Sequence, residues 1–104
     1  VMPEFEFPAT ITHVEITYDP RKSERTLRER NLGFDEAEKF DFASASYFGE
    51  VRRGEHRLVA VGYLRGRLHV LCFLPKERGI RVISFRKAND REARKYGMLK
   101  TFDE

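Results

Sequence analysis

Residues 57–74 read RLVAVGYLRGRLHVLCFL, in which two apolar runs are separated by Arg65-Gly66. A two-residue break containing Gly between runs of β-branched and aromatic residues is typical of a tight β-hairpin. We therefore expect strands over 57–64 and 69–74. This hairpin predicts an antiparallel sheet, and the other elements can be placed around it.

Two further strands are expected on either side of the hairpin, at 45–51 and 80–87. The first is weakly patterned. In the second, alternation would place Val82 and Ser84 on one face and Arg81, Ile83 and Phe85 on the other. On a regular strand Arg81 and Arg86 would also face opposite sides, unless a bulge brings them together.

Helix signals lie before and after these strands. Asp19-Pro20 combines a capping side chain with a proline suited to the first helical position, so we expect a helix to about Arg30, with Leu27 among its few apolar anchors. Asn31 and Gly33 would end this helix, because both tolerate positive φ.

Two more helices complete the expected set. A short one begins at Phe34, with Ala37 and Phe40 also facing the core at i+3 and i+6. The last begins at Asn89, because Asn89 and Glu92 have the spacing of a capping box. Ala93, Tyr96 and Leu99 or Lys100 would lie along one side of this helix, and Gly97 would end or kink it.

The expected order is β-α-α-β-β-β-β-α, with a first strand near 14–18. We expect residues 1–12 to form an N-terminal tail and residues 13–104 to form a single domain. The fold class is α+β: an antiparallel sheet with helices packed on one side of it.

The composition points to a compact protein of a reducing compartment. The chain has 104 residues, of which 36% are charged, and a lone Cys72 that excludes an intrachain disulfide. Cys72 lies in an apolar run, which favours a buried, inert thiol. No apolar run approaches the length of a membrane span, so we expect a cytoplasmic location and no membrane partner.

Positive charge is concentrated near the C-terminus. Residues 75–100 contain nine Lys and Arg against three Asp and Glu, a local charge of +6, whereas the whole chain carries +3. Such a zone favours polyanions. The alternative is a solubilising face, which charge runs usually are.

The sequence contains no motif for a metal or cofactor site. His13, His56 and His69 form no i, i+4 pair, one Cys cannot build a thiolate site, and glycine-rich nucleotide loops are absent from the sequence. Glu55-His56-Arg57 could supply a general base at a strand start, although a solvated hairpin end is the favoured interpretation.

Catalysis by Arg and Lys side chains is the remaining candidate chemistry. Cleaving RNA without a metal requires a base for the 2′-OH, stabilisation of the pentavalent phosphate and a proton for the leaving oxygen. Arg suits the second task because its fork binds two phosphate oxygens. Arg81 and Arg86 are the candidates on the strand at 80–87.

A series of short motifs resembles the BrnT family of toxins from bacterial type II toxin–antitoxin systems. Its order and spacing run over about residues 14–97: Asp19-Pro20-Arg21-Lys22; Leu27; Phe34-Asp35-Glu36-Ala37; Arg57-x4-Gly62; Gly66-Arg67-Leu68-x-Val70; Arg81-x-Ile83-Ser84-x-Arg86-Lys87-Ala88; and Arg91-Glu92-x3-Tyr96.

The resemblance implies a RelE-like fold and a metal-independent endoribonuclease that inhibits translation without a cofactor. It also implies a partner, an antitoxin of the BrnA type with a ribbon-helix-helix domain. The complex would reach operator DNA only through that antitoxin and would repress its own operon.

By position, the resemblance makes Arg81, Arg86, Arg57 and Lys22 candidate catalytic residues, to which Glu55 is added as a candidate base. Many relatives carry Lys-His-Gly at the end of the first helix, where this chain has Arg30 in place of the His. Candidate RNA contacts are Arg30, Arg78, Lys87, Arg91 and Tyr96. A non-catalytic module that binds RNA or a protein partner is the alternative.

Overall fold

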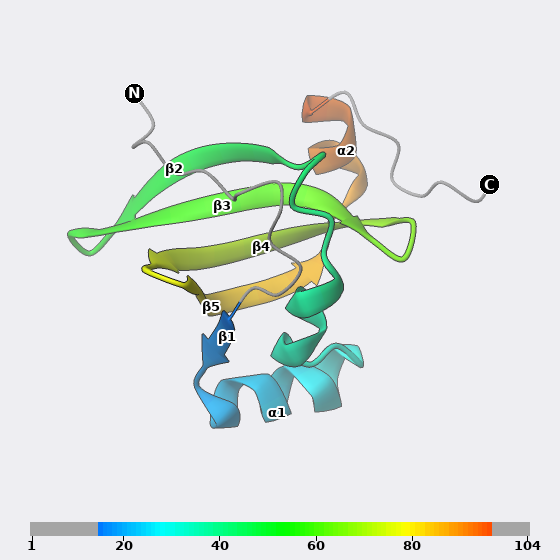
Figure 1. The fold of residues 1–104 in the computed structure, drawn as a ribbon. Helices are drawn as coiled ribbons and strands as arrows, with labels where there is room; N and C mark the ends of the chain where they lie inside the picture. Colours follow the sequence, from blue (N-terminus) through cyan, green and yellow to red (C-terminus); the bar gives the residue numbers. More distant parts are fainter. Residues whose placement is uncertain (1–14, 97–104) are drawn as a thin grey trace.

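A computed structural model describes residues 15–96 (Figure 1). The predicted tail, His13, the strand start at Val14 and the predicted positions of Gly97, Leu99 and Lys100 lie outside these residues. The predicted element order is confirmed: β1 (Glu15–Tyr18), α1 (Pro20–Arg30), the 3₁₀ helix η1 (Phe34–Lys39), β2 (Ser46–Arg52), β3 (Glu55–Leu64), β4 (Arg67–Lys76), β5 (Gly79–Lys87) and α2 (Asp90–Lys95).

The hairpin of β3 and β4 forms the centre of the sheet, as predicted. Its strands pair antiparallel from Leu58 opposite Phe73 to Leu64 opposite Arg67. Arg65 and Gly66 have φ of 51° and 77°, the left-handed pair that a two-residue turn requires. The same turn occurs at Arg53-Gly54, which joins β2 to β3 and was not predicted.

The prediction of a purely antiparallel sheet was wrong. The strand order is β1-β5-β4-β3-β2, and β1 pairs with β5 in parallel. The parallel pair joins strands that are far apart in the sequence, so no turn motif between them could predict it. Gly79 allows this pairing, because a Cβ there would overlap the backbone of Glu15.

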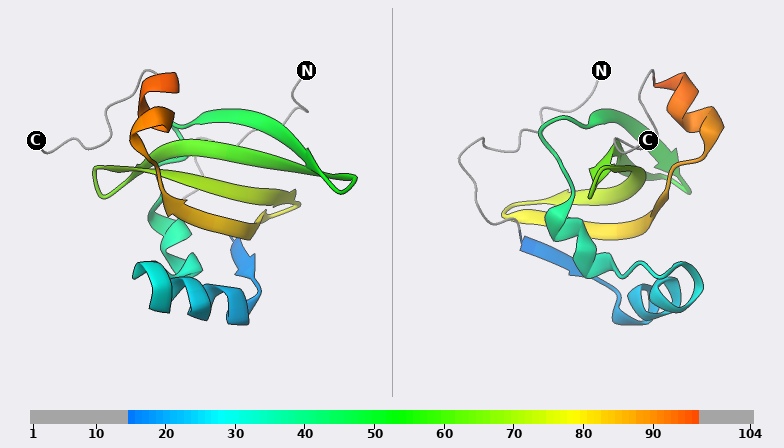
Figure 2. Two further views of the ribbon diagram at one scale, coloured as in Figure 1. Left: turned by 180° about the vertical axis from the view of Figure 1, so that it is seen from behind. Right: turned by 90° about the vertical axis from the view of Figure 1, so that its right-hand side faces the viewer.

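The helices cover both faces of the sheet, not one side as expected (Figure 2). On the first face η1 packs over a core that includes Phe34, Phe73 and Phe85. On the second face α2 packs through Ala93 over a smaller cluster that includes Val61 and Val70. The described helices therefore cover the second face only in part.

Helix α1 has the predicted ends. The Asp19 side chain accepts a hydrogen bond from the Arg21 amide at 3.0 Å, and Asn31 ends the helix with φ of 55°. Leu27 is not an anchor, since it is 52% exposed. The buried residue is Ser23, whose Oγ accepts from the Phe34 amide at 2.9 Å.

The second predicted helix is the 3₁₀ helix η1. Phe34, Ala37 and Phe40 are buried, as predicted from their spacing of three residues. This spacing matches a 3₁₀ helix, in which side chains at i and i+3 eclipse.

Strand β5 contains a bulge that changes the predicted faces. Cys72 pairs with Ser84 and Phe73 pairs with Val82, so Ile83 is an extra residue. Phe85 therefore shares the first face with Val82, and the prediction that placed them on opposite faces was wrong. The bulge also puts Arg81 and Arg86 on the same, second face, opposite Leu74 and Val70.

Candidate nucleic-acid interface

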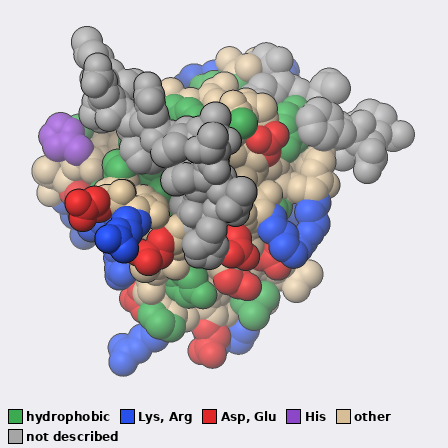
Figure 3. Space-filling model, in the orientation of Figure 1, with side chains coloured by type: hydrophobic (Ala, Val, Ile, Leu, Met, Phe, Trp, Pro, Cys, Tyr) green, Lys and Arg blue, Asp and Glu red, His purple; other side chains and the backbone are tan. Residues whose placement is uncertain are grey.

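Charge is mixed on the face of the molecule that carries α1 and η1. In Figure 3, Asp and Glu side chains lie among Lys and Arg side chains, so this face is not uniformly basic. Cations line several clefts, and one of these lies on the second face of the sheet, beside α2.

We call this hollow the central cleft; its volume is about 740 Å³. Its floor is formed by apolar side chains of β3, β4 and β5, and its rim is formed by charged side chains of several elements. In the described part of the chain, the charged residues that line it are six cations and two acids: Lys22, Arg52, Arg57, Arg86, Arg91, Lys95, Glu50 and Glu92.

The central cleft brings together five of the ten predicted site residues: Lys22, Arg57, Arg86, Arg91 and Tyr96. Lys22 arrives from α1, although α1 follows a strand at the edge of the sheet. β1 pairs only with residues 79–82 of β5. The remaining edge of β5 leaves room for α1 to place Lys22 at the cleft.

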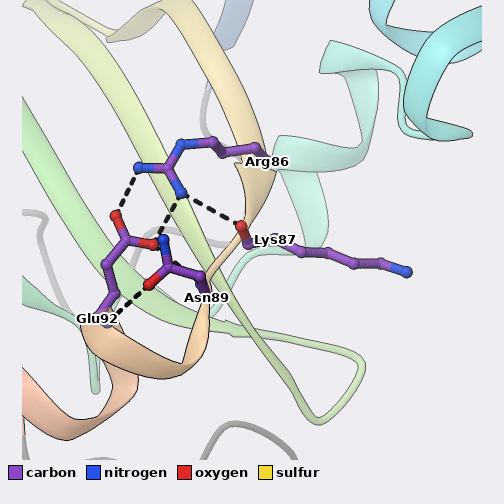
Figure 4. A network of polar contacts seen from close by, with 4 residues as sticks. All are labelled: Arg86, Lys87, Asn89 and Glu92. Atoms are coloured by element: carbon purple, nitrogen blue, oxygen red, sulfur yellow. Dashed lines mark hydrogen bonds and ion pairs between the residues drawn. The ribbon is translucent and has the colours of Figure 1, made fainter.

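Arg86 and Glu92 form a bidentate ion pair inside the central cleft (Figure 4). Nη1 and Nη2 of Arg86 donate to the two carboxylate oxygens of Glu92 at 2.8 and 2.6 Å. Glu92 also completes the predicted capping box with Asn89, at 3.0 and 2.8 Å. The Glu92 carboxylate thus both orients Arg86 and caps the N-terminus of α2.

This pairing changes the acid–base properties of Glu92. The hydrogen bonds from Arg86, more than any other cause, lower the pKa of the Glu92 carboxyl from 4.5 to about 2. The same hydrogen bond raises the pKa of the Arg86 guanidinium. A carboxylate with so low a pKa is a weak base, so Glu92 is suited to positioning Arg86 rather than to accepting a proton.

Arg57 has two carboxylates as neighbours: Glu55 on its own strand, which was a predicted site residue, and Glu50 on β2, which was not. Arg57 Nε donates to Glu55 Oε1 at 2.9 Å, and this hydrogen bond raises the pKa of the guanidinium. Glu55 itself is exposed and is not among the residues that line the central cleft. Glu50 lines it, directly opposite Arg57 in the pairing of β2 with β3.

Cys72 lies at the floor of the central cleft. Cys72 is 7% exposed, which agrees with its predicted buried position, and burial is the main reason that the pKa of its thiol is raised. A thiol of raised pKa stays protonated at neutral pH and is a poor nucleophile.

Two aromatic rings form one wall of the cleft. Phe48 of β2 and Tyr96 at the end of α2 stack with ring centroids 5.6 Å apart and an angle of 9° between their planes. Lys95 Nζ lies 5.5 Å from the centroid of the Tyr96 ring. Planar rings beside cations are suited to stacking unpaired bases.

The other predicted site residues lie elsewhere. Arg78 and Arg81 line a separate cleft of about 450 Å³ at the β4–β5 turn. Arg81 shares the face of Arg86 but lies four pairing positions away along β4, roughly 13 Å. Arg30 and Lys87 line a third cleft.

Residues 15–96 contain no group of three or more His, Cys, Asp or Glu side chains placed to hold a metal ion. Over the same residues, no helix has the length and apolar character needed to cross a membrane.

Comparison with known proteins gives one match. The sequence model of a family described as ribonuclease toxin, BrnT, of type II toxin–antitoxin systems matches residues 18–92. No curated protein and no solved structure matches the chain. The matched segment runs from the end of β1 to Glu92 and includes every charged residue of the central cleft except Lys95.

Proposed function

The chain belongs to the BrnT family of ribonuclease toxins of type II toxin–antitoxin systems, and we propose that it is a metal-independent endoribonuclease that cuts RNA and so inhibits translation. The central cleft is the proposed active site.

The observation that carries this proposal is the convergence of six cations on one concave surface, supplied by α1, β2, β3, β5 and α2. Fixed cations around a partly apolar floor stabilise negative charge more strongly than cations in open solvent do. A phosphodiester gains charge on its non-bridging oxygens as it is attacked. The cleft is therefore suited to stabilising that transition state.

Arg86 and Arg57 are the proposed transition-state ligands. Each is oriented by a carboxylate, Arg86 by Glu92 and Arg57 by Glu55. Arg57 donates to Glu55 through Nε, and we propose that the Nη groups of the same guanidinium bind a phosphate oxygen. Arg86 must share its fork with the substrate or exchange Glu92 for it.

Proton transfer requires a base and an acid. We propose Glu50 as the base for the 2′-OH, because it lines the cleft opposite Arg57. Glu55, the base expected from the sequence, would have to act from outside this lining. Lys22 is the proposed acid for the 5′ leaving oxygen, and Tyr96 with Arg91 would hold the flanking nucleotides.

The proposal also includes features beyond the cleft. Arg81 and Arg78 would contact RNA at the β4–β5 turn, where they line one hollow. The arrangement of the α+β sheet would be of the RelE-like kind. We place the protein in the cytoplasm, where RNA is available.

Membership of the family implies an antitoxin partner. We propose that this partner is of the BrnA type, with a ribbon-helix-helix domain, and that it covers the basic central cleft. Operator DNA would then be bound by the antitoxin and not by this chain.

The test is cleavage of a single-stranded RNA by the purified protein with EDTA present. New ends should appear, and Arg57→Ala should abolish most of the activity while Lys39→Ala, an exposed change outside the central cleft, should not. Salt-dependent RNA binding without new ends would contradict the proposed enzyme and favour a non-catalytic RNA-binding module.

A further inference from the structure

The third cleft, which we call the turn cleft, has a volume of about 330 Å³ and lies beside the β3–β4 turn. Four cations line it, and they come from three parts of the chain: Arg30 from the end of α1, Arg65 and Arg67 from the hairpin, and Lys87 from the end of β5. Within residues 15–96, no acidic residue is among those that line it.

The floor of the turn cleft is formed by buried side chains. Leu32, Leu64 and His69 line it, and all three are buried. Nδ1 of His69 donates to the Arg67 carbonyl oxygen at 2.7 Å, and its ring lies 5.5 Å from that of Phe85. Burial lowers the pKa of His69, so the ring is neutral at neutral pH and the charge of the cleft comes from its Arg and Lys side chains.

The arginines of the turn cleft are incompletely paired by the protein. Arg65 forms an ion pair with Glu36 at 2.7 Å. The Nε of Arg67, by contrast, is buried and has no hydrogen-bond partner within residues 15–96. A buried donor without an acceptor costs about 1–3 kcal/mol, a cost that an anionic oxygen would relieve once the Arg67 side chain turned its Nε into the cleft.

The two clefts are connected through two elements. Arg86 and Lys87 are consecutive on β5 and point away from each other, Arg86 toward Glu92 and Lys87 to the opposite side (Figure 4). Arg86 lines the central cleft and Lys87 lines the turn cleft.

Helix α1 makes the second connection. Lys22 lines the central cleft and Arg30 lines the turn cleft. They lie eight residues apart on one side of the helix, with Thr26 between them, which spans about 12 Å. A single-stranded polyanion bound at one cleft would thus be able to continue along α1 to the other.

We propose that the turn cleft is a second RNA-binding subsite, which holds backbone phosphates of the same single strand that occupies the central cleft. This inference rests on the proposed function for the identity of the polyanion. The connecting helix favours a long polyanion over a small phosphate compound, because a small anion would need only one of the two clefts.

The test uses 2′-O-methyl RNA, which binds but is not cut. Oligonucleotides of about four and about twelve nucleotides, in the range of known single-strand sites, are titrated by fluorescence anisotropy at several salt concentrations. The probe variant is Arg30→Gln with Lys87→Gln, since both side chains are exposed. The control is Lys39→Gln with Arg94→Gln, which removes the same charge from exposed positions outside both clefts.

We expect the probe variant to bind the long RNA about tenfold more weakly, and its salt slope to fall by about 1.4, or about 0.7 for each lost phosphate contact. Binding of the short RNA should be unchanged, and so should its cleavage when the 2′-OH is present. The control variant should match the wild type.

Equal loss in the probe and control variants would overturn the inference, since it would show only a general charge effect. An unchanged salt slope combined with weaker binding of the antitoxin would also overturn it and would assign the turn cleft to an acidic protein segment. Failure of the proposed function looks different: the wild type would bind long RNA through both clefts and yet leave cleavable RNA intact.

Discussion

Both carboxylate oxygens of Glu92 are bonded to the guanidinium of Arg86, at 2.8 and 2.6 Å. Glu92 belongs to the first turn of α2 and Arg86 to the end of β5, so the pair fixes α2 to the strand that carries the proposed site. Stability and activity should therefore both depend on this pair.

The first prediction concerns pH. The pKa of Glu92 is about 2 in the folded protein and about 4.5 in the unfolded chain. A lowered folded pKa contributes stability that is present above pH 4.5 and is lost as the pH falls toward 2. The free energy of unfolding of Glu92→Gln should be lower than that of the wild type by roughly 2 kcal/mol at neutral pH, a value reduced for partial exposure.

Urea unfolding of both proteins checks this prediction. The difference between them should shrink to nearly zero at about pH 2, because other carboxyl groups titrate equally in both. A difference that does not change with pH would show that Glu92 acts only through packing or helix capping.

The second prediction separates the two arginines of β5. Arg86→Ala should lower the single-turnover rate of RNA cleavage by about 10²–10³-fold, the usual cost of removing one donor to a transition-state oxyanion. Arg86→Lys should recover only part of this loss, because Lys lacks the planar fork. Arg81 lies outside the central cleft, so Arg81→Ala should cost less than about tenfold. A larger loss from Arg81→Ala would move the site toward the β4–β5 turn.

Local features of the fold could be predicted from the sequence because their signals are local. Asp19, Asn31 and the Asn89–Glu92 box fix helix ends by hydrogen bonds within a few residues, and Arg65-Gly66 fixes a turn by backbone conformation. The parallel pairing of β1 with β5 could not be predicted, because it joins residues more than sixty positions apart.

The site was only partly predictable for the same reason. Arg57, Arg86 and Lys22 were identified, but alternation alone separated Arg81 from Arg86, and the extra residue Ile83 reverses that result. Glu50 was missed because the Arg53-Gly54 turn was not recognised. A two-residue turn there pairs Arg52 with Glu55, and it follows that Glu50 lies opposite Arg57.

The third prediction concerns the attachment of α1. Ser23 Oγ accepts from the Phe34 amide at 2.9 Å in a buried position. Ser23→Ala would leave that amide without an acceptor, so it should lower the free energy of unfolding by about 1–3 kcal/mol. Ser44→Ala is the matched control, because its hydrogen bonds to Asp41 are exposed; it should cost less than about 0.5 kcal/mol. Equal effects in urea unfolding would mean that the Ser23 hydrogen bond adds nothing.

The last prediction distinguishes two candidate bases by the same substitution. Glu50 and Glu55 lie on paired strands at either side of Arg57, but only Glu50 is among the residues that line the central cleft. Glu50→Gln should lower the cleavage rate by about 10²–10⁴-fold, the range of general base catalysis, with little change in RNA affinity. Glu55→Gln should have a smaller effect, because it removes a hydrogen bond that orients Arg57 and not the proton acceptor. The two rates are compared in single-turnover cleavage, with affinity measured on 2′-O-methyl RNA. A full loss from Glu55→Gln with normal activity of Glu50→Gln would return the base to the position expected from the sequence.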